Sequence, residues 1–118
     1  MEIARFQEAV ERHGRRFLER VFTARELEEV GANPASLAAR WAAKEAVSKA
    51  LCTGIGEVGW REIEILRGPA REPVLHLHGA AQELAGRLGL DEWTLSLSHT
   101  RTHAIATVVA FGRSNEKR

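Results

Sequence analysis

The stretch SLAARWAAKEAVSKALCTGIG, residues 36–56, decides the fold of this 118-residue chain. It is rich in alanine, the residue with the highest helix propensity, and its first glycine is Gly54. We therefore expect a helix from Ser36 to about Leu51, the strongest helix in the chain. The glycines of Thr53–Gly56 then allow a tight turn.

A second helical pattern precedes this stretch. Its apolar residues follow helical spacing, and they are Ile3, Phe6, Val10, Phe17 and Val21. Gly14 interrupts the run, so the pattern predicts either one kinked helix or two helices in succession. Arg5 and Arg12 are seven residues apart and share a face away from the apolar stripe.

A short helix is predicted next. Thr23 and Glu26 have the spacing of a capping box, in which each residue satisfies a backbone amide at the helix start. The helix should continue to about Val30, because Gly31 and Pro34 follow.

The second half of the chain has the alternation of strands. Ile63 and Ile65 alternate with glutamates, which predicts a half-buried strand. The remaining predicted elements are a strand at Val74–His78, a helix at Ala80–Leu88, and two strands around Trp93–Leu97 and Ile105–Phe111 that flank the polar turn His99–His103.

Helices first and strands later predict an α+β fold, with N-terminal helices packed on a small antiparallel sheet. We expect a single domain over residues 1–112 and a flexible tail over residues 113–118. So small a sheet exposes much apolar surface for its size. We therefore expect another subunit to cover part of it.

The composition excludes several classes of protein. Seventeen basic residues against sixteen acidic ones argue against a nucleic-acid binder. The single cysteine, Cys52, excludes an internal disulfide and a cysteine-rich zinc site, and it suits a reducing cytoplasm. The charged N-terminus is no signal peptide, and no apolar run approaches the roughly 20 residues of a membrane span. The histidines have no convincing zinc spacing.

Three candidate sites remain, and the first is Glu45 with Lys44 and Lys49. A carboxylate between lysines suits phosphoryl chemistry, because magnesium takes one or two carboxylates together with waters and substrate phosphates. The lysines would offset phosphate charge. The simpler interpretation is a surface ion pair between Glu45 and Lys49, one helical turn apart.

The second candidate is the loop that carries Gly54 and Gly56, whose backbone N–H groups can cradle a phosphate. The simpler interpretation is a helix cap at Gly54.

The third candidate is Ser98, His99 and Thr100, which can bind an anion through hydroxyls and an imidazolium. The simpler interpretation is a polar hairpin turn. A Ser–His hydrolase is disfavoured because adjacent Ser98 and His99 on a strand point to opposite faces.

Four stretches together resemble the holo-acyl-carrier-protein synthase family of 4′-phosphopantetheinyl transferases. They are RFLERVFTARELEE (residues 16–29), RWAAKEAVSKALCTGIG (40–56), WREIEIL (60–66) and LSLSHTRTHAIATVV (95–109). Their order and spacing match the family over nearly the whole chain. The combination of KEAVSKA, TGIG and SLSHT is highly specific.

The resemblance implies the 4′-phosphopantetheinyl transferase fold and its reaction. Magnesium holds the pyrophosphate of coenzyme A, and a serine hydroxyl of the acyl carrier protein attacks the β-phosphorus in line. Phosphopantetheine is transferred and adenosine 3′,5′-bisphosphate leaves. The family is usually a homotrimer with sites between neighbouring subunits, and it serves fatty-acid biosynthesis in the bacterial cytoplasm.

The resemblance also implies residue roles. Glu45 matches the metal-ligand glutamate. Lys44 and Lys49 match the lysines beside it, and Lys49 is the one we assign to the phosphates or the attacking hydroxyl. Further matches are the nucleotide loop at Gly54 and Gly56, the site for the 3′-phosphate at Ser98, His99 and Thr100, and the carrier-protein helix at Arg5 and Arg12.

Two departures from the family pattern are visible. Cys52 stands where a glycine is common. The family opens with a strand that carries Gly-x-Asp, whereas this sequence begins at Met1-Glu2-Ile3, without that strand and its metal-binding aspartate. We expect the native start to lie upstream. The alternatives are a catalytically silent trimeric subunit and an anion-binding module that lacks one metal ligand.

Overall fold

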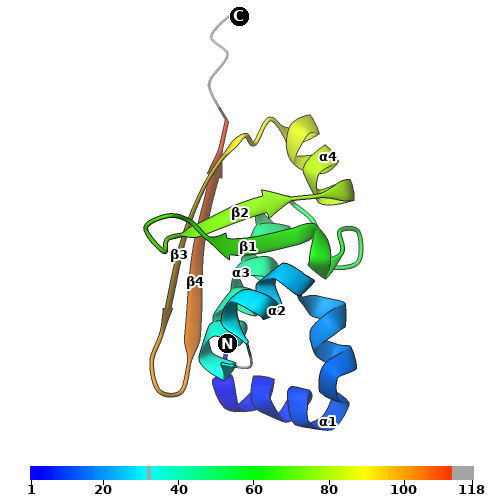
Figure 1. Cartoon of the computed structure of the whole chain (residues 1–118). Helices are drawn as coiled ribbons and strands as arrows, with labels where there is room; N and C mark the ends of the chain where they lie inside the picture. Colours follow the sequence, from blue (N-terminus) through cyan, green and yellow to red (C-terminus); the bar gives the residue numbers. More distant parts are fainter. Residues whose placement is uncertain (32, 113–118) are drawn as a thin grey trace, which may run out of the picture.

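The computed structural model describes residues 1–31 and 33–112, so the predicted flexible tail lies outside the described residues. Within these described residues the fold has four α-helices, one 3-10 helix and two strand pairs, arranged as in Figure 1. In chain order they are α1 (Ile3–Val21), α2 (Ala24–Val30), α3 (Pro34–Ala50), η1 (Trp60–Glu62), β1 (Ile63–Arg67), β2 (Pro73–Leu77), α4 (Gly79–Leu88), β3 (Glu92–His99) and β4 (Ala104–Phe111).

The predicted kink in α1 is confirmed at Gly14, which has φ 68° and ψ −152°. Positive φ is easily adopted by glycine because it has no Cβ. The capping box is also confirmed: Glu26 N–H donates to Thr23 Oγ1 over 3.1 Å, and Thr23 N–H donates to Glu26 Oε1 over 2.9 Å. Local sequence therefore sets both breaks in the N-terminal helical region.

Helix α3 begins two residues before the predicted Ser36. The side chain of Asn33 accepts a hydrogen bond of 3.1 Å from Ser36 N–H, and Pro34 occupies the first helical turn. Proline is well suited to that position, because its fixed φ fits a helix and its missing N–H would have no helical partner there.

The strands form two antiparallel pairs, β1–β2 and β3–β4, instead of one sheet. The predicted hairpin is confirmed, with Ser98 opposite Ile105 across it. The prediction that β1 is half-buried is wrong. Ile63, Glu64, Ile65 and Leu66 are all buried, and Glu64 accepts hydrogen bonds that offset the cost of burying its carboxylate.

One face of the long hairpin packs against α3, where Leu95 joins Ala43 in a core cluster. The opposite face carries exposed apolar side chains on β4: Ile105 at 56% exposure, Val109 at 51% and Phe111 at 49%. Alternate residues of a strand point to opposite faces, so these three share the outward face.

The hairpin runs along α3 with its tip at the start of that helix (Figure 1). Ala104, directly after the turn, belongs to the same core cluster as Leu37 near the start of α3, whereas Trp93 packs against the cluster that contains Val47 and Leu51 near its end. Helix α3 has 17 residues. At a rise of about 1.5 Å per residue, its ends are about 25 Å apart.

Aromatic rings join α1 to α3. Trp41 lies 5.2 Å from Phe6, 5.6 Å from Phe17 and 5.7 Å from Trp60, measured between ring centroids. The start of the chain pairs with β4, since the Met1 amino group donates to the Ala104 carbonyl over 2.9 Å. None of the helices within residues 1–31 and 33–112 is both long and apolar enough to cross a membrane.

Candidate active site

Glu45 and Lys49 lie one turn apart on α3, and both side chains are exposed. Among residues 1–31 and 33–112, the Glu45 and Lys49 side chains have no hydrogen-bond or ion-pair partner. The simpler interpretation of this pair, an ion pair across one helical turn, is therefore not what the structure contains. An exposed carboxylate and an exposed ammonium remain available to an external ligand.

Lys44 has a different environment from its neighbour Glu45. Its side chain is fully buried, and its ammonium donates to Glu26 Oε1 over 2.8 Å, to the Trp60 carbonyl over 3.0 Å and to the Ile63 carbonyl. Burial lowers the pKa of Lys44, and the charge of Glu26 opposes that shift. Because an ammonium has three protons, all are committed inside the protein. This arrangement favours a structural role over the phosphate-binding role predicted from the sequence.

A second, partly buried pair lies one turn earlier on α3, where Arg40 is buried and the Glu29 side chain is 22% exposed. Arg40 Nη2 donates to Glu29 Oε2 over 3.0 Å, and Arg40 Nε donates to the Ile65 carbonyl over 3.1 Å. Burial lowers the pKa of Arg40, and Glu29 again opposes the shift. Neither pair is among the predictions from the sequence. The sequence does carry a signal for them. Glu26 and Glu29 are three residues apart on α2, and Arg40 and Lys44 are four residues apart on α3.

The glycine loop follows α3 directly, but Gly54 is not the helix cap. Cys52, which follows the C-cap residue Leu51, has a left-handed conformation with φ 60°. Its N–H donates to the Lys49 carbonyl over 2.9 Å, and Thr53 N–H donates to the Ser48 carbonyl over 3.2 Å. These two bonds define a Schellman motif. Gly54 is exposed beyond the cap, whereas Gly56 N–H donates to the Val58 carbonyl over 3.0 Å.

Ser98, His99 and Thr100 are exposed at the end of β3. The Thr100 hydroxyl accepts from the N–H groups of Thr102 and His103, over 3.2 and 3.1 Å, and so organises the turn. The turn interpretation therefore holds for Thr100, while the side chains of Ser98 and His99 still face solvent.

The structure separates two groups of predicted site residues. Gly54 and Gly56 follow the end of α3, and Glu45 and Lys49 lie in its second half. Ser98, His99 and Thr100 lie at the hairpin tip, near the start of the same helix. One copy of the chain therefore does not bring both groups to one point.

Arg5 and Arg12 line a groove on α1. Two adjoining pockets share Ala9, Arg12 and His13, so they form one continuous basic groove. Its lining comprises Arg5, Glu8, Ala9, Arg12, His13, Arg16, Phe17 and Arg20. Arg16 and Arg20 are not predicted from helical spacing, because the kink at Gly14 changes how the two halves of α1 share a face.

The basic groove borders the part of α3 that carries Glu45. Phe17 in the groove contacts Trp41, with ring centroids 5.6 Å apart. Trp41 precedes Glu45 by four residues, which is one helical turn.

A family model for the 4′-phosphopantetheinyl transferase superfamily matches residues 1–108. The chain belongs to this superfamily. It is 47% identical over 119 residues to the holo-[acyl-carrier-protein] synthase of Herpetosiphon aurantiacus, covering 95% of this chain and 94% of that protein. It is also 47% identical over 118 residues to the synthase of Moorella thermoacetica, covering 98% and 90%.

Solved structures of the superfamily share the fold. The Helicobacter pylori synthase in complex with coenzyme A has a TM-score of 0.86 and 34% identity, covering 94% of this chain and 95% of that one. The Bacillus anthracis synthase in complex with coenzyme A (3′,5′-ADP) has a TM-score of 0.77 and 30% identity, covering 96% and 91%. The predicted α+β fold of this superfamily is therefore confirmed.

The donor set of this superfamily member suits only one kind of magnesium site. Within the described ranges, no group of three or more His, Cys, Asp and Glu side chains could hold a metal ion. Glu45 offers one exposed carboxylate without a protein partner. Magnesium often binds through one or two carboxylates with waters and substrate phosphates, so Glu45 fits a site completed by substrate.

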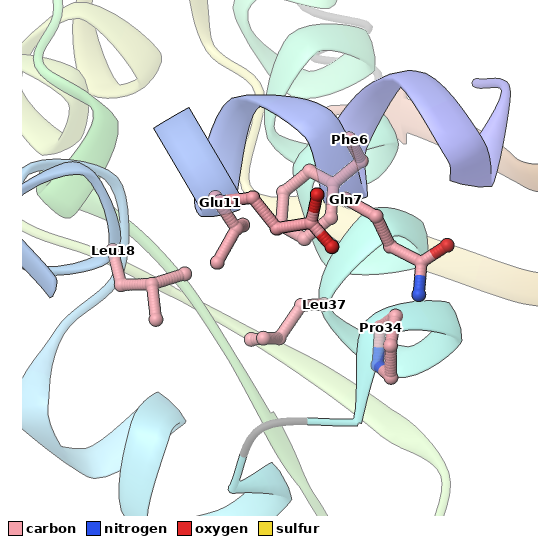
Figure 2. Close-up of a pocket in the computed structure, with 7 residues that line it drawn as sticks. Phe6, Gln7, Glu11, Leu18, Pro34 and Leu37 are labelled. Carbon is pink, nitrogen blue, oxygen red and sulfur yellow. The ribbon is translucent and has the colours of Figure 1, made fainter. Parts of the chain in front are cut away.

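A separate apolar pocket of about 150 Å³ lies between α1 and α3 (Figure 2). Among the described residues its lining includes Phe6, Leu18 and Leu37, and Glu11 is the one charged side chain of that lining. The pocket suits an apolar group, because a phosphate there would meet a carboxylate and no cation.

Proposed function

We propose that the chain transfers the 4′-phosphopantetheine group of coenzyme A to a serine of an apo-acyl carrier protein, for fatty-acid biosynthesis. The products are the holo-carrier protein and adenosine 3′,5′-bisphosphate. Similarity to holo-[acyl-carrier-protein] synthases over nearly the whole chain supports this activity. The structural observation that carries it is the exposed, unpartnered pair of Glu45 and Lys49 beside a basic groove.

In this reaction the serine oxygen forms a bond to the β-phosphorus while the bond from that phosphorus to the bridging oxygen of the pyrophosphate breaks. The hydroxyl proton is released, and the leaving group takes the bridging oxygen with it. The ammonium of Lys49 offsets the negative charge of the phosphates, which is the main requirement of phosphoryl transfer. Lys44 has no part in this contact, because its ammonium is already saturated.

Glu45 would hold a magnesium ion together with the pyrophosphate oxygens and waters. When bound, the ion supplies positive charge that polarises the phosphoryl oxygens. The carboxylate suits this role because no other group of the described chain uses it.

We infer that a homotrimer completes the site. Within one chain the hairpin residues Ser98, His99 and Thr100 lie near the start of α3 and Glu45 lies in its second half, so a neighbouring subunit would supply them for the 3′-phosphate. Gly54 and Gly56 would contact the nucleotide from the same subunit as Glu45. The exposed face of Ile105, Val109 and Phe111 offers an apolar surface for the contact between subunits.

The basic groove would receive the carrier protein. Arg5 and Arg12 lie in it together with Arg16 and Arg20, and acyl carrier proteins are acidic. Opposite charges accelerate association and orient the encounter. The groove borders the turn of α3 that carries Glu45, so a carrier serine held there would be near the phosphates. The cytoplasmic location stays a prediction.

One assay tests the activity directly. Purified protein is incubated with coenzyme A, magnesium chloride and an apo-acyl carrier protein, and the carrier is weighed by intact-mass spectrometry. We expect a gain equal to one phosphopantetheine group per carrier. A silent subunit or a simple anion-binding module would leave the carrier mass unchanged, and that result would overturn the proposal.

A further inference from the structure

The outer edge of β1 is capped by side chains. Within the described residues β1 pairs only with β2, so its other edge has no strand neighbour. On that edge, Ile65 N–H donates to Glu26 over 2.8 Å and Arg67 N–H donates to Glu29 over 2.9 Å. The carbonyls of the same edge accept from side chains of α3, namely Lys44 at Ile63 and Arg40 at Ile65. Two ion pairs from α2 and α3 thus take the place of a strand.

This capping fixes α3 at two points. Arg40 and Lys44 are one turn apart, and each donates to a different carbonyl of β1. Two fixed points on one helix define its rotation about its axis and its position along that axis. Lys44 contributes most to fixing α3, because its three acceptors come from three elements: Glu26 on α2, Trp60 on η1 and Ile63 on β1.

We propose that the buried Lys44–Glu26 pair is a positioning pair that orients α3 so that Glu45 and Lys49 face the substrate. The inference rests on the roles proposed above for Glu45 and Lys49. Glu45 follows Lys44 directly and is 100° further around the helix, so any rotation at Lys44 is transmitted to it.

Small rotations are enough to matter. Side chains reach about 5–6 Å from a helix axis, so a rotation of about 20° moves their ends by about 2 Å. A misplacement of about 1 Å at a reacting centre can cost about 100-fold in rate. An apolar pair at positions 26 and 44 would keep the core filled but would lack directed bonds to the carbonyls. Replacing buried ion pairs by apolar residues often leaves stability unchanged or improves it, so stability alone gives little reason for charges here.

The test uses three variants, assayed at a temperature at which circular dichroism shows each to be folded. Lys44→Met removes the ammonium and leaves Glu26 buried without its partner. The double variant Glu26→Gln/Lys44→Met leaves no buried charge at either position. Ala85→Gly, at a buried position on α4, lowers stability without touching either ion pair.

We expect kcat to fall at least about tenfold in both Lys44 variants, with the KM for the carrier protein unchanged, because the basic groove lies on α1. The double variant should regain thermal stability relative to Lys44→Met without regaining kcat. Ala85→Gly should keep the wild-type kcat. Wild-type kcat in the folded double variant, or an equal loss in Ala85→Gly, would overturn the proposal.

A second measurement does not depend on turnover. In ¹H–¹⁵N spectra of the double variant, the amide signals of residues 45–49 should shift, and calorimetry should show weaker binding of coenzyme A. Unchanged signals over these residues would contradict a positioning role even if activity fell. Full activity of Glu45→Gln would instead overturn the proposed site, so the two failures can be told apart.

Discussion

Glu45 and Lys49 stand one turn apart on the exposed side of α3, and in the described chain neither side chain has an intramolecular partner. Opposite charges at this spacing commonly pair on helices, although such pairs contribute only a few tenths of a kcal/mol. Because neither side chain contributes an intramolecular bond to the fold, substitutions of Glu45 or Lys49 should change activity while leaving the free energy of unfolding nearly unchanged.

We predict that Glu45→Gln lowers phosphopantetheine transfer by about 100-fold or more, because glutamine keeps the shape of the side chain but lacks the charge that magnesium needs. Its free energy of unfolding should stay within about 0.5 kcal/mol of wild type. The mass-spectrometric transfer assay and a thermal melt measure the two quantities.

Glu83→Gln on α4 is the matched control, since it makes the same chemical change at another exposed helical position. It should leave turnover unchanged. Near-wild-type turnover of Glu45→Gln with a normal magnesium requirement would remove Glu45 from the site.

Charge reversal in the basic groove should slow carrier binding. We predict that Arg5→Glu and Arg12→Glu reduce the association rate with the carrier protein, most strongly at low ionic strength, where charges are least screened. Stopped-flow association across a salt series measures the effect. Arg87→Glu on α4 makes the same change outside the groove and should have little effect. Equal rates for all three variants at every salt concentration would show that the carrier binds elsewhere.

Cys52 is a non-glycine residue with φ 60° at the end of α3. A left-handed conformation costs an L-residue roughly 1–2 kcal/mol, whereas glycine loses about 0.5–1 kcal/mol through the entropy of its unfolded state. We therefore predict that Cys52→Gly raises the free energy of unfolding by up to about 1 kcal/mol. Cys52→Ala is the control, because it removes the thiol and keeps the Cβ. A gain in both variants would mean that the thiol, and not the backbone, is the cause.

Local features of this fold could be predicted from the sequence. The capping box of Thr23 and Glu26 and the kink at Gly14 depend on residues within four positions of one another, and both are confirmed. The burial of Lys44 could not be predicted in the same way. Its acceptors lie 16 to 19 residues away along the chain, and two of them are backbone carbonyls with no side-chain signature.

The candidate site also combines local features that the sequence predicts with tertiary features that it does not. Exposed Glu45 and Lys49 follow from helical spacing, because both positions lie outside the buried side of α3. The distance between Glu45 and the hairpin residues depends on the direction in which β3 runs along α3, which is a tertiary property. The buried Glu64 likewise depends on Thr23, 41 residues away, whose hydroxyl donates to it over 2.6 Å.

Acid should destabilise the protein partly through Glu62. Its pKa is lowered by hydrogen bonds from the backbone N–H groups of Gly59 and Ala80. A carboxyl whose pKa is lower in the folded state than in the unfolded state stabilises the folded state at pH values above the unfolded-state pKa. This stabilisation is lost as the pH falls through the folded-state pKa. We predict that Glu62→Gln loses less thermal stability than wild type between pH 6 and pH 3, a range that spans the ordinary glutamate pKa of about 4.3. Parallel melting curves against pH would contradict this linkage.

The outward face of the long hairpin provides the last prediction. Ile105, Val109 and Phe111 are each about half exposed there, an unusual amount of apolar surface for three of the four outward positions of one strand. If another copy covers this face, Val109→Glu places a charge where water is excluded, and the assembly should dissociate. Light scattering after size-exclusion chromatography should give the mass of three chains for wild type and a smaller mass for the variant. Transfer activity should fall with it, because Ser98, His99 and Thr100 would no longer meet Glu45 of a neighbour.

Leu88→Glu on α4 is the control, since it makes the same kind of change at a residue with 44% exposure away from the hairpin. A wild-type protein that is monomeric and fully active would show that one chain suffices and that the hairpin residues are not part of the site.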